Sequence, residues 1–255
     1  MKRLDAMIEV MGKEKANAIH RVERDYMKGI RLHPYLGYAG PNMPRMSAST
    51  AVFGGSTAWG MGAGGVGIAS HISGATNFAV PGYVAQQNLI QLAINDPIDQ
   101  AILLNGVNEA ISAILNDPDG FPLQFRQVSN QWRRKHRTKQ APRRSIMSAS
   151  MAARRILSKA WARADRFSSI MCLQPYVGIG KKVLTPLEER LLEHDRSNFP
   201  EMPEVYRNLR SMCVYDERVD LCDVFEHVTE TVYLDSCHLT PMGYEILAAR
   251  IKEEL

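Results

Sequence analysis

The sequence predicts an α/β fold in which a parallel sheet of about five strands lies between layers of helices. Two observations predict it. Short apolar runs with the length of buried strands recur along the chain, and stretches with helical spacing separate them. Each run ends near a glycine, a proline or an asparagine, as strands do where they enter loops. With 255 residues, 45% of them hydrophobic, the chain is long enough to bury one sizeable core.

The segments before the first strand read as an extension and a connector. Residues 1–30 alternate charged and apolar side chains and predict a polar helix that ends near Gly29. Proline and glycine recur over residues 33–44 and forbid long regular elements there. We therefore expect an N-terminal helical extension at 1–30 and a single domain at 31–255.

Four apolar runs predict strands, and a fifth strand has two candidate positions. The four runs are 50–53, 77–80, 101–104 and 169–173, and the fifth strand is either 214–215 or 219–221. Helices are expected over 83–93, after Pro186 and after Pro241, where apolar residues recur at helical spacing.

Residues able to carry chemistry follow these strands. In such sheets a ligand binds beyond the carboxyl ends of the strands. The candidates are Ser56 after the first strand, Gly82 after the second, Asn105 and Asn108 after the third, and Asp235 and His238 after the fifth. A serine hydroxyl attacks at neutral pH when an imidazole, held in one tautomer by a carboxylate, takes its proton. Asp and His three residues apart can both face the serine from one turn, which indicates nucleophilic acyl transfer.

Four short blocks of the sequence resemble the SGNH, or GDSL, hydrolase family. They are Gly54-Gly55-Ser56-Thr57, Val80-Pro81-Gly82-Tyr83, Gly106-Val107-Asn108-Glu109 and Asp235-Ser236-Cys237-His238, and they stand in the family's order. The resemblance covers roughly residues 33–110 and 169–255. Two positions depart from the family pattern: Gly55 replaces an aspartate before the serine, and Glu109 replaces the last aspartate of the third block.

The resemblance implies a flavodoxin-like three-layer α/β/α sandwich with a catalytic triad. Ser56 would be the nucleophile, His238 the base and Asp235 the residue that orients it. The backbone N–H groups of Ser56 and Gly82 and the side-chain amide of Asn108 would form the oxyanion hole. We prefer Asn108 to Asn105 because of its place in the motif.

The function expected from these residues is a serine esterase that removes a short acyl group, possibly from a carbohydrate, through an acyl-Ser56 intermediate. An O-acyltransferase with the same triad is an alternative. A non-catalytic module that binds an anionic polymer or a membrane is another. No cofactor and no metal are expected, and the substrate would be a small-molecule or carbohydrate ester.

Two other sequence patterns could indicate a function, but the evidence for them is weaker. Gly62-Ala63-Gly64-Gly65-Val66-Gly67 fits a dinucleotide-binding turn, but it lies well past the first strand and no Asp or Glu occurs from Ala51 to Asn95 to bind a ribose. We expect these glycines to form a flexible rim beside Ser56. Cys237, next to His238, could be a nucleophile, but neighbouring side chains on an extended loop point apart.

Positive charge is concentrated in one segment. Thirteen Lys or Arg and one acid occur between Arg126 and Arg166, within an insertion expected at about 110–167. We expect a helical lid whose charges are solvated, with possible contact to an anionic surface through Arg133, Arg134, Lys135, Arg137, Arg143 and Arg144. No specific nucleic acid is expected.

The cysteines and the N-terminal segment bear on the compartment. The four cysteines lack CxxC spacing, so reduced and mostly buried thiols are expected. Residues 1–30 contain no apolar run of the length that a leader or a membrane span needs. We expect a cytoplasmic protein, or an exported one if a leader was removed.

Overall fold

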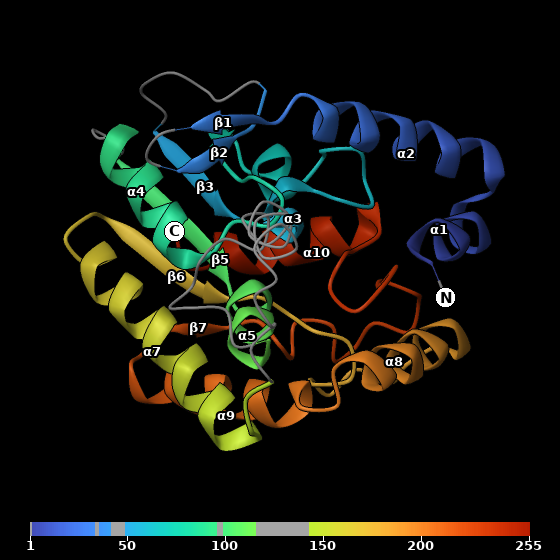
Figure 1. The fold of residues 1–255 in the computed structure, drawn as a ribbon. Helices are drawn as coiled ribbons and strands as arrows, with labels where there is room; N and C mark the ends of the chain where they lie inside the picture. The colour runs from blue at the N-terminus through green and yellow to red at the C-terminus, as the bar shows by residue number, and fades with distance from the viewer. Residues whose placement is uncertain (1, 34–35, 42–48, 96–98, 116–142) are drawn as a thin grey trace, which may run out of the picture.

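The central sheet has five parallel strands in the order β4-β3-β5-β6-β7. The computed structural model describes residues 2–33, 36–41, 49–95, 99–115 and 143–255. The strands are β3 (Thr50–Gly54), β4 (Ala75–Asn77), β5 (Gln100–Asn105), β6 (Ser169–Leu173) and β7 (Val219–Asp220). Helices flank this sheet in a three-layer α/β/α sandwich, which confirms the predicted fold class (Figure 1).

The two central strands, β3 and β5, set the position of the site. Their side chains are buried on both faces from Ala51 to Phe53 and from Ala101 to Leu104, which is why each reads as a continuous apolar run. They pair in parallel from Thr50 opposite Gln100 to Gly54 opposite Leu104. The chain leaves β3 for β4 on one side and returns to β5 on the other. Such a reversal of strand order is where open α/β sheets bind ligands.

Helices cover both faces of the sheet. On one face α7 (Ile146–Ala164) packs against α4 (Ala85–Asn95), α5 (Val107–Ile114) and α9 (Met202–Tyr215). Behind the sheet in Figure 1, α10 (Pro241–Lys252) packs against the 3-10 helix η1 (Ile68–His71). None of the helices in the described ranges combines the length and the apolar character that a bilayer crossing requires.

The N-terminal extension is a helical hairpin, not the single helix that was predicted. Helix α1 (Arg3–Met11) and helix α2 (Lys13–Lys28) pack against each other and are separated by Gly12, whose φ of +84° interrupts a helix. A two-stranded antiparallel ribbon follows, formed by β1 (Arg31–His33) and β2 (Gly37–Ala39). On the outside of the hairpin, Glu9 accepts from Arg190 of α8 (Pro186–Asn198) at 2.6 Å.

Two strand boundaries differ from the prediction. The second strand is 75–77, although the backbone N–H groups of Phe78 and Val80 still donate to the carbonyls of Val52 and Gly54. The fifth strand is at 219–220, and the alternative, 214–215, is the exposed end of α9. Helix α9 itself was not predicted.

The described part of the basic segment does not form a lid. Helix α7 is the crossover between β5 and β6, and it buries Ala153, Leu157 and Trp161 in the main core. Its Arg154, Arg155, Lys159 and Arg163 lie on the exposed side. The positive charge of this described part is explained by the exposed face of α7, which is in contact with water. The domain boundaries given above stay predictions.

A buried glutamate fixes the loop that leads to Asp235. Glu188 is fully buried on the first turn of α8. Its Oε1 accepts from the backbone N–H groups of Val232 and Tyr233 at 2.9 and 3.1 Å. Its Oε2 lies 3.0 Å from Nζ of the buried Lys182. A buried charge pair is costly to break because the remaining ion keeps its desolvation cost without a partner.

We expect Glu188→Gln to lower the free energy of unfolding by about 3 kcal/mol, because it leaves the buried Lys182 ammonium without its counter-charge and with only the carbonyls of Val183 and Val228 as acceptors. Urea unfolding followed by circular dichroism measures the change. Glu189→Gln, on the exposed side of the same turn, is the control and should cost less than about 0.5 kcal/mol. Equal losses in the two variants would contradict the anchoring role.

Candidate active site

Ser56 is the first residue of the short helix α3 (Ser56–Trp59), directly beyond the carboxyl end of β3. The turn between them depends on a glycine. A Cβ on Gly54 would lie 2.5 Å from the Ala58 side chain and 2.7 Å from the carbonyl oxygen of Leu104, so the helix can fold back on the strand only without one. The half-buried serine is thereby presented at the edge of the sheet between β3 and β5.

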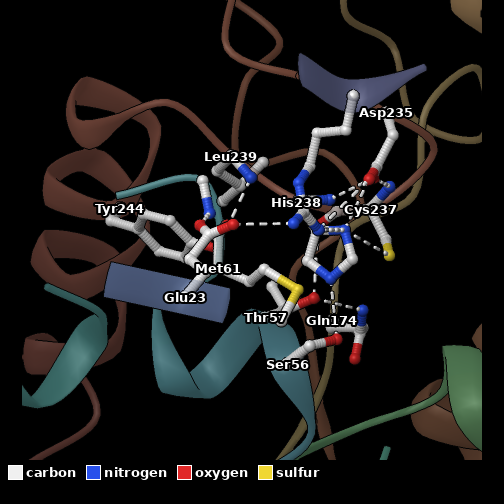
Figure 2. A network of polar contacts seen from close by, with 12 residues as sticks. Glu23, Ser56, Thr57, Met61, Gln174, Asp235, Cys237, His238, Leu239 and Tyr244 are labelled. Atoms are coloured by element: carbon white, nitrogen blue, oxygen red, sulfur yellow. Dashed lines mark hydrogen bonds and ion pairs between the residues drawn. The ribbon is translucent and has the colours of Figure 1, made fainter. Parts of the chain in front are cut away.

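His238 and Asp235 meet Ser56 from the other end of the chain. His238 Nε2 lies 2.7 Å from Ser56 Oγ, and His238 Nδ1 lies 2.6 Å from Asp235 Oδ2 (Figure 2). Asp235 Oδ1 accepts from the backbone N–H groups of Cys237 and His238 at 3.0 and 2.8 Å. The carboxylate therefore holds both the ring and its own loop, and the structure brings together the three residues singled out from the sequence.

The surroundings of His238 and Asp235 favour the charged forms of both side chains, an imidazolium beside a carboxylate. Burial is the largest single influence and lowers the pKa of His238, but the Asp235 carboxylate and the neighbouring Cys237 together raise the pKa above the ordinary value. Burial alone would raise the pKa of Asp235, and the His238 ring, the Arg3 guanidinium and the Cys237 N–H together hold it well below its usual range. The carboxylate is ionised at any pH near neutrality.

A chain of hydrogen bonds between buried polar side chains supports the loop that carries His238. Thr57 Oγ1 donates to the carbonyl of Cys237 at 3.2 Å and accepts from Gln174 Nε2 at 3.1 Å. The carbonyl of Gln174 accepts in turn from Tyr206 Oη at 3.0 Å. Figure 2 shows Thr57 and Gln174 beneath the imidazole. Gln174 was not singled out from the sequence, although it follows the fourth predicted strand.

The two asparagines after β5 occupy different environments. Asn108 Nδ2 donates to the Tyr83 carbonyl at 2.7 Å, and a Cβ on Gly55 would lie 2.4 Å from it. Asn108 is thus beside the serine turn, and Gly55 is the residue that makes room for it. Asn105 is buried, its Oδ1 accepts from Trp161 Nε1 at 3.3 Å, and its Nδ2 donates to Glu109 Oε1 at 3.4 Å.

Glu109 joins the loops that carry Gly82 and Asn108. It is fully buried, and its two carboxylate oxygens accept from the backbone N–H groups of Ala85 at 2.6 Å and Gly106 at 2.7 Å. Burial raises the pKa of this carboxyl. Glu109 therefore fixes the start of α4 relative to the start of α5. Gly82 itself has φ +85°, a conformation that favours glycine.

The glycine-rich segment 60–67 is a packed turn, not the flexible rim that was expected. The backbone N–H of Gly62 donates to a carboxylate oxygen of Glu23, a residue that is 2% exposed. Tyr244 Oη donates to the carbonyl of Met61 at 2.7 Å. Positive φ angles occur at Gly60, Gly62, Gly64 and Gly65. The glycines are therefore needed for backbone conformations that other residues rarely adopt.

Two charged residues of the N-terminal hairpin reach the site and were missed from the sequence. Arg3 NH1 lies 3.4 Å from His238 Nδ1 and 3.9 Å from Asp235 Oδ2. Arg3 NH2 donates to Glu23 Oε2 at 2.7 Å. No local motif marks either residue, because their partners lie more than 200 residues away along the chain or on a second helix.

Cys237 is close to the histidine without competing for its reactive nitrogen. Its Sγ lies 3.9 Å from Nδ1, the nitrogen that Asp235 already occupies, and the residue is 7% exposed. Among the described residues, Asp235, Cys237 and His238 form the one group with metal-ligating atoms within 4.8 Å of one another. The 2.6 Å between Nδ1 and Oδ2 is a hydrogen-bond distance, and two ligands about 2 Å from one tetrahedral zinc would stand farther apart.

The candidate anionic contact lies mainly outside the described residues. Arg133, Arg134, Lys135 and Arg137 are in that part of the chain. Arg143 and Arg144 are described, and both bind within the protein. Arg143 NH2 donates to the Asn198 carbonyl at 2.8 Å and its guanidinium stands 5.5 Å from the Phe199 ring centroid, while Arg144 NH1 donates to the Ala113 carbonyl at 3.3 Å.

No protein-family model matches the chain, and no curated protein matches it. The solved structures similar to it include esterases and a hydrolase. An acetyl xylan esterase, AlAXEase, is 11% identical with a TM-score of 0.47, covering 81% of this chain and 99% of its own. The acetylxylan esterase Axe2 from Geobacillus stearothermophilus is 13% identical with a TM-score of 0.45, covering 83% and 95%.

A third match is LAE5, an alpha/beta hydrolase from the metagenome of Lake Arreo, Spain, at 12% identity and a TM-score of 0.46, covering 83% of this chain and 96% of its own. The chemistry follows from the site.

The environments of the two asparagines predict losses of stability of different size. Asn105→Ala should lower the free energy of unfolding by about 1–3 kcal/mol, because it leaves the Trp161 N–H buried without its acceptor. Asn108→Ala, at a half-buried position, should cost less than about 1 kcal/mol. Urea unfolding of both variants measures the two losses of unfolding free energy. A larger loss for Asn108→Ala would show that Asn108, and not Asn105, has the structural role.

Proposed function

We propose that this protein is a serine hydrolase that cleaves a short acyl ester, with a carbohydrate or another small alcohol as the leaving group. One observation carries the proposal. The Ser56 hydroxyl, the His238 ring and the Asp235 carboxylate form a continuous chain of contacts of 2.7 and 2.6 Å. Asp235 occupies Nδ1, so Nε2 is the nitrogen that faces the hydroxyl, as a general base requires.

The first half of the reaction uses these groups in sequence. Neutral His238 takes the proton of Ser56 Oγ through Nε2 while Oγ forms a bond to the ester carbonyl carbon. The resulting imidazolium is stabilised by the ionised Asp235. It then gives its proton to the leaving alkoxide as the carbon–oxygen bond breaks, which releases the alcohol and leaves the acyl group on Ser56.

The second half repeats the steps with water. His238 removes a proton from water, the hydroxide attacks the acyl carbon, and the proton returns to Ser56 Oγ as the carboxylic acid leaves. Atoms and charge balance without any cofactor. An O-acyltransferase would differ only in the attacking group, a sugar hydroxyl in place of water.

The negative charge that develops on the carbonyl oxygen needs donors fixed beforehand. We assign this role to the backbone N–H groups of Ser56 and Gly82 and to Asn108 Nδ2. In support, Asn108 uses one amide hydrogen on the Tyr83 carbonyl, so the second remains available on the side of the Gly55–Ser56 turn. Removing one such donor typically lowers the rate by about 10²–10³. Asn108→Ala should do so while its fold is retained.

We expect Ser56→Ala to lower kcat/KM for p-nitrophenyl acetate by at least about 10⁴, because no other hydroxyl is held against His238 Nε2 in the described structure. Initial rates at saturating and limiting substrate measure it. Ser70→Ala, an exposed serine on η1, is the matched control and should keep the wild-type rate. A Ser56→Ala protein with unchanged rates would eliminate the proposal.

The pH dependence follows from the raised pKa of His238. Only the neutral ring can accept the serine proton, so kcat/KM should rise with pH as the imidazolium loses its proton. Since Asp235 raises this pKa, the midpoint of the rise should lie above 6.5, the ordinary value for histidine. In Asp235→Asn the carboxylate is lost and the midpoint should fall, together with the rate. A wild-type midpoint below 6.5 would contradict the charge distribution.

A further inference from the structure

The N-terminal helical hairpin, α1 and α2, is docked on the loop that carries Asp235 and His238. Leu234, the residue before Asp235, is fully buried in one apolar cluster with Met7 of α1 and Ala16 of α2. Its backbone N–H donates to the His238 carbonyl at 2.8 Å, which closes the loop around the acid and the base. The hairpin therefore supplies apolar contacts for Leu234, while Tyr233 and Cys237 of the same loop pack in the main core.

The hairpin also supplies the charges that face the pair. The guanidinium of Arg3 contacts both the Glu23 carboxylate and the Asp235–His238 pair. The distances are 2.7 Å to Glu23 Oε2, 3.4 Å to His238 Nδ1 and 3.9 Å to Asp235 Oδ2. The side chain of Arg3 is 21% exposed and that of Glu23 is 2% exposed, so solvent screens this contact only in part.

We propose that Arg3 is a positioning residue of the site. Its cation fixes the orientation and the charge of the Asp235–His238 pair, and Glu23 is the counter-charge that holds Arg3 in place. This inference rests on the proposed function for its catalytic meaning, but the electrostatic coupling exists whether or not the protein turns over an ester. It makes catalytic competence depend on a segment outside the sandwich.

The sign of the coupling follows from elementary electrostatics. A cation near the ring disfavours the imidazolium, and an anion near that cation offsets it. In the part of the chain that the structure describes, the other titratable groups near His238 are Asp235 and Cys237 on its own loop. Asp195 of α8 and Tyr244 of α10 interact electrostatically with Asp235. These groups remain when the hairpin charges are changed. Neutralising Arg3 should therefore raise the pKa of His238, and neutralising Glu23 should lower it.

Titration of the full-length protein labelled with 15N-histidine tests this directly. Arg3→Gln should move the His238 midpoint up by about one pH unit, and Glu23→Gln should move it down by about half a unit, as expected for charges at these distances in a partly screened site. The double variant should return towards the wild type. His238→Asn identifies the resonance among the seven histidines.

Two controls separate charge from packing. Arg3→Lys keeps the cation and should leave the midpoint near the wild-type value. Glu9→Gln removes the contact between the hairpin and Arg190 of α8, away from the site, and should leave it unchanged. If Glu23→Gln merely undocked the hairpin, Arg3 would be lost from the site and the midpoint would rise, which is the opposite of the expected direction.

The same variants assayed with p-nitrophenyl acetate should shift the acid limb of kcat/KM in the same directions. Unmoved His238 midpoints in both Arg3→Gln and Glu23→Gln, or shifts of the same sign, would overturn the inference. Failure of the proposed function would look different. The wild type would then be inactive on esters while the His238 titration still responded to the two charges.

Discussion

The contact between the Asp235 carboxylate and the His238 ring is the constraint on which the site depends. One carboxylate oxygen holds Nδ1 at 2.6 Å, and the other accepts two backbone N–H groups of the same loop. The loop conformation and the ring orientation are thus set by a single side chain. Because Nδ1 is occupied, Nε2 is directed to Ser56, which arrives from β3 at the opposite end of the sequence.

Burying so much polar surface is favourable only when each group finds a partner. Here the partners come from several layers. Glu188 of α8 binds the approach to the loop, Thr57 and Gln174 support it from the sheet side, and Arg3 contacts it from the hairpin. Each support is a hydrogen bond or ion pair across elements far apart in sequence. The geometry at Ser56 is therefore a property of the whole fold.

The sequence carried the fold class and the three central residues because their signals are local. A continuous apolar run ending in glycine identifies a buried parallel strand, and Asp and His three residues apart identify a turn. Distant contacts left no such signal. Glu23 and Arg3 look like ordinary helix charges until the hairpin is docked, and Gly12 looked like a helix residue until its φ of +84° was seen. Helix α7 was misread as a lid because its buried face is alanine-rich and its exposed face is basic.

The most direct test of the account is to identify the residue that an organophosphonate modifies in the native protein, by peptide mass spectrometry. The reagent forms an adduct with a side chain that its surroundings have made nucleophilic. The contacts of Ser56 with His238 predict one adduct, on Ser56, that is absent when the protein is unfolded in urea and in His238→Ala. An adduct on Cys237 or on another serine, or no adduct on the folded protein, would contradict it.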